Sequence, residues 1–167
     1  MARTQLLPLL LLVACGGSTA EASPSVRNLP KFEVANGVAA PGMSTLPLDL
    51  RLTGALQDAV LVEFQLEYDV SRFRPVSGRS ALEAKQGLRT LDGEENGSGI
   101  RIVCGDGKNP SAQRLQEGDL LRLWLDVLPP RTLGDCTIHL RNVRMVNAEG
   151  VVVPVDPTTA IGRITVQ

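Results

Sequence analysis

The chain has 167 residues, with 17 lysines and arginines against 18 acidic residues, so its formal net charge is −1. This balance gives no reason to expect nucleic-acid binding, and the sequence shows no basic stripe or aromatic platform for it. Aromatic residues make up only 3% of the sequence. A hydrophobic core must therefore be built mainly from leucine, valine, isoleucine and alanine.

Residues 1–14 have the character of a secretion signal. Arg3 precedes an apolar run that ends at Ala14, and this run is shorter than the ~20 apolar residues that a membrane-spanning helix needs. The following "LVAC" resembles the lipobox of bacterial lipoproteins. The resemblance implies that Cys15 carries lipid and anchors the protein at the bacterial cell envelope, on the outer membrane where there is one. An ordinary secretion signal cut after Ala20 is the alternative, and it predicts a secreted protein.

Residues 15–28 are expected to form a flexible tether. They are small and polar, with almost no large apolar side chains. A coil of this composition and length reaches roughly 20 Å. The folded domain is then expected to span residues 29–167, a length that can bury a substantial core.

The domain sequence alternates between apolar and polar residues with a period of two, as in strands with one buried face. The alternating runs are 45–52, 59–70, 99–105, 119–128, 135–146 and 160–167. Segments rich in Gly, Pro, Asn and Asp, including 91–99, separate them and are expected to be turns. The pattern predicts an all-β fold of two antiparallel sheets that cover each other. One segment, 80–85, fits either an irregular strand or a helical turn in which Ser80 and Glu83 form a capping box.

The order and spacing of these runs resemble those of a cohesin domain. Three stretches carry the resemblance. They are residues 32–54 with "LPLDL", residues 60–78 with "FQLEYD", and residues 116–150 with "EGDLLRLWLDV" and a late strand that ends in "NAEG". Cohesins are jelly-roll sandwiches that bind dockerin modules. The resemblance implies a two-sheet antiparallel jelly-roll sandwich of about nine strands, acting as a non-catalytic interaction module.

The resemblance also implies a partner-binding face. In cohesins one sheet face, which includes the third, fifth and sixth strands, docks a pair of partner helices. Alignment on the Tyr-Asp motif and on "GIRIVCGD" transfers this face to six residues: Leu61, Glu63, Gln65, Arg101, Val103 and Asp106. Aliphatic and charged side chains together suit a transient interface with an apolar centre and a polar rim. An ordinary solvated sheet face with two exposed aliphatic residues is the alternative.

The competing function is binding to polysaccharide, as part of polysaccharide breakdown. Cohesins share a superfamily with carbohydrate-binding sandwiches, which stack sugar rings on exposed aromatic side chains. Alternation predicts that Trp124 points outward between Arg122 and Asp126. The alternative places Trp124 under a loop or beside Pro129 and Pro130.

Catalytic and metal chemistry are weakly represented. No nucleophile, base and orienting group converge in the sequence, so neither an enzyme nor a cofactor is expected. The single histidine, His139, is interpreted as a solvated strand residue. Asp92, Glu94 and Glu95 could attract calcium, but they lack the spacing of a calcium loop, and a solvated turn is the preferred interpretation.

A disulfide between Cys104 and Cys136 remains open at this point. Export from the cytoplasm favours the bond. In the cohesin arrangement, however, Cys104 ends one strand and Cys136 begins a parallel strand of the same sheet. The two residues would then lie near opposite ends, whereas a disulfide needs Cα atoms within ~7 Å.

Overall fold

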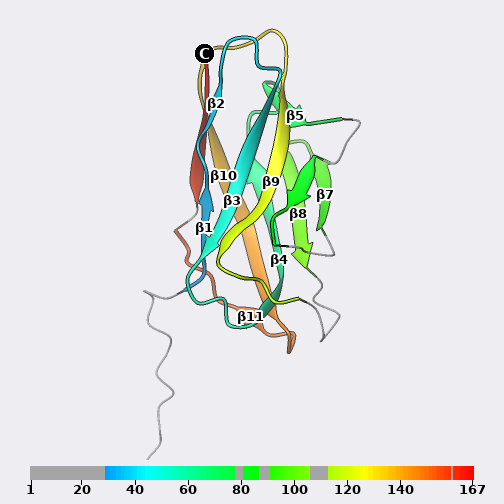
Figure 1. The fold of residues 1–167 in the computed structure, drawn as a ribbon, viewed down its shortest axis with the longest axis vertical. Helices are drawn as coiled ribbons and strands as arrows, with labels where there is room; N and C mark the ends of the chain where they lie inside the picture. Colours follow the sequence, from blue (N-terminus) through cyan, green and yellow to red (C-terminus); the bar gives the residue numbers. More distant parts are fainter. Residues whose placement is uncertain (1–28, 78–80, 87–90, 106–112, 159) are drawn as a thin grey trace, which may run out of the picture.

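The computed structural model describes residues 29–77, 81–86, 91–105, 113–158 and 160–167. Within them the chain forms twelve strands and no helix, arranged in two sheets (Figure 1). The predicted all-β sandwich is therefore confirmed, with more strands than the nine expected because several are only two or three residues long. No described helix could cross a membrane. The predicted signal, Cys15 and the tether lie outside the described residues.

The two sheets differ in size. The first has five strands: β1 (Lys31–Val34), β3 (Thr45–Thr53), β9 (Gly118–Val127), β5 (Phe73–Pro75) and β6 (Leu82–Ala84), the last two both paired with β9. The second has seven strands: β2 (Gly37–Ala39), β12 (Ile161–Val166), β10 (Gly134–Asn147), β4 (Ala59–Glu67), β8 (Gly99–Gly105), β7 (Leu91–Asn96) and, beside β10, β11 (Val152–Val153). Among the described strand pairs only β2 and β12 run parallel.

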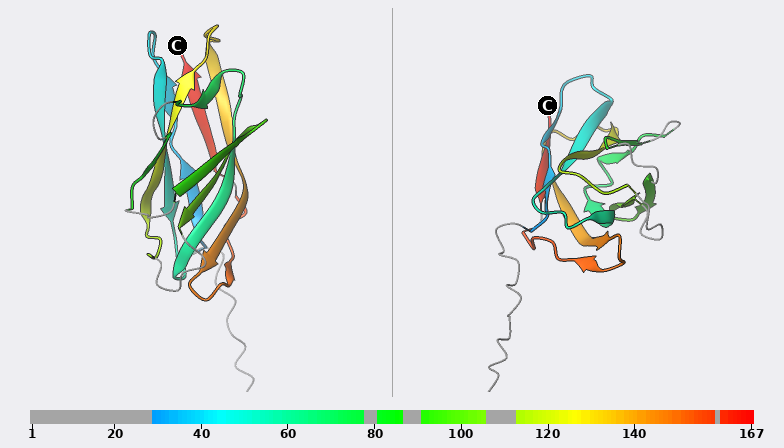
Figure 2. Two further views of the ribbon diagram at one scale, coloured as in Figure 1. Left: turned by 90° about the vertical axis from the view of Figure 1, so that its right-hand side faces the viewer. Right: turned by 60° about the horizontal axis from the view of Figure 1, so that its bottom comes forward.

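The core lies between the sheets, which Figure 2 shows from the side. Alternation in β3 turns four leucines inward, from Leu46 to Leu52, and none is more than 1% exposed. From the other sheet, β4 contributes Val62, Phe64 and Leu66, which are buried to the same degree. The predicted alternation is thus confirmed in β3 and β4, since each strand buries one row of side chains and leaves the other row outside the core.

A bulge changes the phase of β10. Cys136, Ile138 and Leu140 point inward, as predicted. Between Arg141 and Arg144 the strand then holds one residue more than the facing part of β4, and Asn142 adopts a positive φ of 52°. Such an extra residue shifts the alternation by one position.

One local prediction is wrong in part, and the structure decides one alternative that the sequence left open. Residues 91–99 were expected to be a turn, but residues 91–96 form β7, and only the short link before Gly99 turns. β7 is an edge strand with an exposed side, so it needs no apolar alternation. Residues 82–84 form β6, which pairs with β9 and places Glu83 opposite Arg122, so this segment is a strand and not a helical turn. Ser80 lies outside the described residues.

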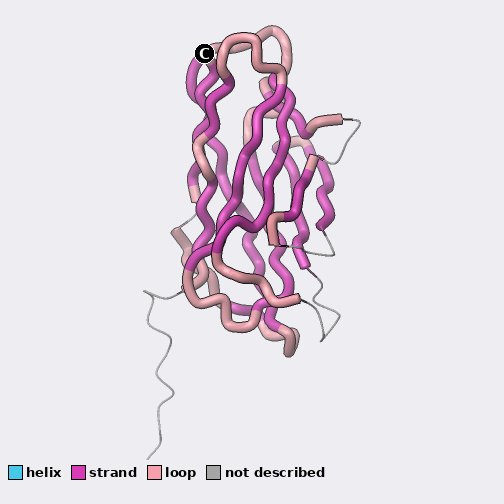
Figure 3. Tube along the Cα trace, in the orientation of Figure 1, coloured by secondary structure: helices cyan, strands magenta, loops and turns pink. Residues whose placement is uncertain are grey.

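Loops gather at the two ends of the sandwich (Figure 3). The proximal end holds Leu29, Gly54 and the β10–β11 turn; the distal end holds the C-terminal Gln167 and the β9–β10 loop. At the distal end, Arg72 donates hydrogen bonds to the carbonyl oxygens of Thr132, Gly134 and Asp135, at 2.7 to 3.2 Å. This arginine fixes the β9–β10 loop against the β4–β5 connection.

Candidate functional site

Five of the six residues predicted to bind a partner lie together on the outer face of the seven-stranded sheet. Leu61, Glu63 and Gln65 come from β4, and Arg101 and Val103 come from the neighbouring β8. They point outward because they alternate with the buried residues of the same strands. The sixth residue, Asp106, lies outside the described residues.

Strand register arranges this face in rows that cross β10, β4, β8 and β7. Directly opposite residues have Cβ atoms about 5 Å apart, so each row is a line of neighbouring side chains. We name each row after its β4 residue. The Gln65 row is Arg141–Gln65–Arg101–Glu94, the Glu63 row is Arg144–Glu63–Val103–Asp92, and the Leu61 row is Val152–Val146–Leu61–Gly105, in which Val152 comes from β11.

The Leu61 row is aliphatic and lies nearest the proximal end. Val146 is directly opposite both Leu61 and Val152. Val146 is only 6% exposed, whereas Val152 is 57% exposed. With Val103 in the next row, Leu61 and Val152 form the accessible part of an apolar group that spans four strands, and the buried Val146 fills the space between them. Sequence reasoning missed both valines, because the β10 bulge determines which way Val146 points and the two-residue β11 has no recognisable pattern.

The polar side chains beyond this area are held in place by one another. The Nε of Arg101 donates to Glu63 at 2.7 Å, a second guanidinium nitrogen contacts the same oxygen, and Glu94 lies 3.9 Å from a third. The hydrogen bond and the charge of Glu63 raise the pKa of Arg101. Gln65 donates to the Ser98 hydroxyl at 2.9 Å. A partner would therefore meet side chains that are already ordered.

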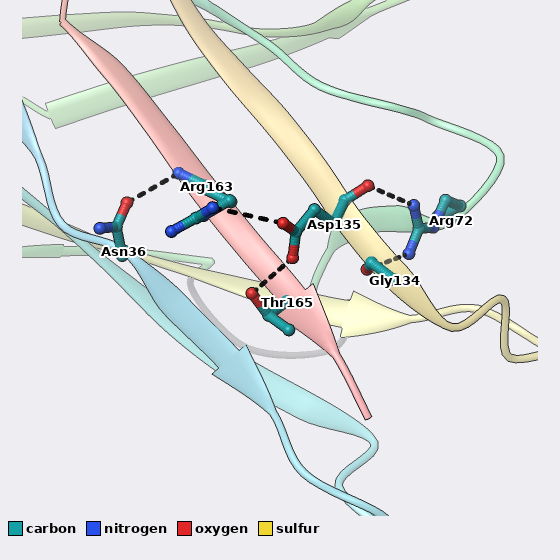
Figure 4. Close-up of polar contacts among 6 residues, drawn as sticks. All are labelled: Asn36, Arg72, Gly134, Asp135, Arg163 and Thr165. Carbon is teal, nitrogen blue, oxygen red and sulfur yellow. Dashed lines mark hydrogen bonds and ion pairs between the residues drawn. The ribbon is translucent and has the colours of Figure 1, made fainter.

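The distal end of β10 and β12 carries a separate polar cluster, shown in Figure 4. The carboxylate of Asp135 accepts hydrogen bonds from Thr165 at 2.7 Å and Arg163 at 3.3 Å. The backbone N–H of Arg163 donates to the side chain of Asn36 at 3.0 Å. These groups satisfy one another and fasten the edge of the sheet, so we assign them a structural role.

Trp124 lies on the opposite sheet and points outward, as predicted, but it is half-buried. The guanidinium carbon of Arg122 lies 5.6 Å from the centre of its ring. Arg122 is held there by two hydrogen bonds to Asp49, at 2.7 and 2.9 Å, and Glu83 is hydrogen-bonded to the Trp124 side chain. The carboxylate of Asp126 accepts a hydrogen bond from the Thr45 hydroxyl at 3.3 Å and forms an ion pair with Arg74 at 3.7 Å. The half-buried Trp124 already has Arg122 over its ring, so this geometry gives no support to polysaccharide binding.

The described residues show no metal site. Asp92 and Glu94 point to the outer face while Glu95, one position on, points to the other, and no three metal-ligating side chains gather within the described ranges. His139 is half-buried on β10, opposite Glu67 and Ile161 in the strand register.

Cys104 and Cys136 are both free and buried. Cys104 faces Val62 on β4, and Val62 faces Met145 on its other side. Met145 is nine residues along β10 from Cys136 (145 − 136), which separates the thiols by roughly 30 Å. The argument against the disulfide that the cohesin resemblance implies is therefore correct, and the argument from an oxidising compartment is not.

We expect peptide mapping without reductant to recover both cysteines as free thiols. In the native protein at pH 8, thiol reagents should react with Cys104 far more slowly than in urea. Burial raises the pKa of this thiol to about 12, and the thiolate is the reactive form. A peptide pair linked through Cys104 and Cys136 would contradict the register described above.

Comparison of the sequence with protein-family models and with curated proteins gives no match. Solved cohesins are nevertheless similar in fold. The cohesin CaCohA2 from Clostridium acetobutylicum is 17% identical, with a TM-score of 0.68 over 84% of this chain and 92% of that chain. The sixth cohesin of scaffoldin B from Acetivibrio cellulolyticus, solved in complex with a dockerin, is 13% identical, with a TM-score of 0.68 over 84% and 100%.

A cohesin that is not from a cellulosome extends the same comparison. The non-cellulosomal cohesin from the archaeon Archaeoglobus fulgidus is 15% identical, with a TM-score of 0.59 over 82% of this chain and 91% of that chain. At these identities the similarity concerns the arrangement of the strands. The chain thus has the fold of the cohesin jelly-roll sandwich.

Proposed function

We propose that this protein is a non-catalytic interaction module that binds a dockerin-like protein partner through the outer face of β10, β4, β8 and β7. The observation that carries the proposal is the apolar area of Leu61, Val103 and Val152, with the buried Val146 between Leu61 and Val152, bordered by ordered ion pairs. An apolar centre inside a polar rim is the usual anatomy of a protein interface. Structures of similar fold include cohesins solved with dockerins.

The position of the face within the sheet supports recognition by side chains. β4 is hydrogen-bonded to β10 on one side and to β8 on the other, and β8 is also paired with β7. Their backbone groups are therefore unavailable for strand addition. A partner that sits over β4 and β8 must instead bind through side chains, as a helix does.

The proposal includes an anchor at the cell envelope. The lipobox resemblance of "LVAC" supports lipid attachment at Cys15, and the small polar residues that follow support a tether of roughly 20 Å. Leu29, where the described domain begins, lies at the proximal end near Gly54. The Leu61 row would then be on the membrane side of the binding face. Labelling with palmitate in cells, with Cys15→Ser as the comparison, tests this part.

Calorimetric titration with dockerin modules tests the binding function. The dockerin solved with the Acetivibrio cellulolyticus cohesin is one probe, and dockerin modules from the organism that makes this chain are the others. We expect saturable binding by at least one module, with amide shifts in nuclear magnetic resonance spectra confined to β4, β8, β10 and β7. Amide shifts centred on Trp124 would contradict the proposal. So would the absence of binding by every module at a protein concentration about 100 times a micromolar Kd.

A further inference from the structure

The Glu63 row ends in two charges of opposite sign. Arg144 stands at the β10 end and Asp92 at the β7 end, and both are exposed. Within the described part of the chain neither joins an ion pair, although Arg144 faces Glu63. Glu63 is already bound to Arg101. Among the described residues, the carboxylate of Asp92 accepts a local hydrogen bond from the backbone N–H of Gly93 at 2.9 Å, and its charge adds to that of Glu63 in raising the pKa of Arg101.

The spacing of these charges fits the width of a helix. β10 and β7 are separated by three strand spacings, or about 14 Å. Between them lie Glu63 and Val103, with Leu61 beside them in the next row. A helix is about 10 Å wide. A helix that lies along β4 and β8 would therefore rest on the aliphatic residues and extend one flank toward Arg144 and the other toward Asp92.

We infer that these two charges fix the direction of a partner helix on this face. The helix would place an apolar stripe on Leu61 and Val103, an acidic flank over Arg144 and a basic flank over Asp92. Reversing the helix end for end exchanges its flanks and brings like charges together at both margins. Two exposed ion pairs against two like-charge contacts correspond to a preference of about tenfold in affinity. The inference rests on the proposed function, because it concerns the same face.

Two synthetic peptides test the direction. Both are stapled helices with one leucine stripe, and they differ only in that the glutamate and lysine flanks are exchanged. Each carries a nitroxide at its N-terminus, which broadens the amide signals of nearby residues. We expect one peptide to broaden signals at Ser98, which lies beyond the Gln65 row on the side toward the distal end, and the other to broaden signals at Ala148, at the proximal end.

Charge exchange in the protein provides the decisive comparison. The double variant Arg144→Glu/Asp92→Arg should reverse the direction of both peptides. Arg51→Glu is the matched control, because Arg51 lies exposed on β3 of the other sheet, and it should change neither direction.

The outcomes separate this inference from the proposed function. If both peptides bind, lose binding with Leu61→Asp, and broaden both ends equally, the face binds helices but the charges do not orient them. The inference then fails while the proposed function stands. If neither peptide binds at millimolar concentration, while a dockerin does, the assignment of a single helix along β4 and β8 is overturned.

Discussion

Replacement of Gly105 with alanine is expected to destabilise the domain by more than about 3 kcal/mol, among the larger effects of single substitutions. Gly105 ends β8 opposite Leu61 and has a φ of 89°. A side chain in this conformation costs roughly 1–2 kcal/mol. In addition, a Cβ atom here would lie 2.9 Å from the carbonyl carbon of Val60 and still closer to its oxygen. Because the neighbour is backbone, only separation of β8 from β4 relieves the overlap.

Urea unfolding followed by circular dichroism and by the fluorescence of Trp124 measures this loss. Gly42→Ala is the matched control, since Gly42 has a similar φ of 81° but no atom within 4 Å of the added Cβ. We expect the control to lose about 1 kcal/mol, which is the conformational part alone. Equal losses in the two variants would show that the close approach of β8 to β4 does not limit stability at Gly105.

Leu61→Asp is expected to weaken partner binding at least about 100-fold, in the range of hot-spot residues. Leu61 is half-buried at the centre of the aliphatic row, between Val146 and Gly105. A bound partner would bury the new carboxylate beside Val146, where the apolar stripe of the partner offers it no hydrogen bond. The side chain lies on the outer face, so the free protein should still fold.

Calorimetric titration with the bound dockerin module, together with the melting temperature of each variant, checks this expectation. Leu133→Asp is the control, because Leu133 is a leucine that is 68% exposed on the β9–β10 loop, outside the rows of the face. It should bind as the unchanged protein does. Normal binding by a folded Leu61→Asp variant would exclude the outer face of β4 as the centre of the interface.

The sequence predicts the part of the candidate face on β4 and β8, but not the part on β10 and β7. Leu61, Glu63, Gln65, Arg101 and Val103 follow from alternation within two regular strands, and their common outward direction is as expected. Val146 does not, because the extra residue at the β10 bulge reverses the direction of the residues after it. Arg144 and Asp92 come to lie at the two ends of one row only through the pairing of four strands.

The sequence by itself determined the all-β class, the strands with one apolar face, the outward direction of Trp124 and the outward-facing residues of β4 and β8. These depend on local alternation, which each strand carries in its own residues. Only the tertiary structure decided the registers, the β10 bulge, the pairing of the edge strands β6, β7 and β11, and the separation of Cys104 from Cys136. Register depends on contacts between residues far apart in the chain, and edge strands lack the buried face that makes alternation visible.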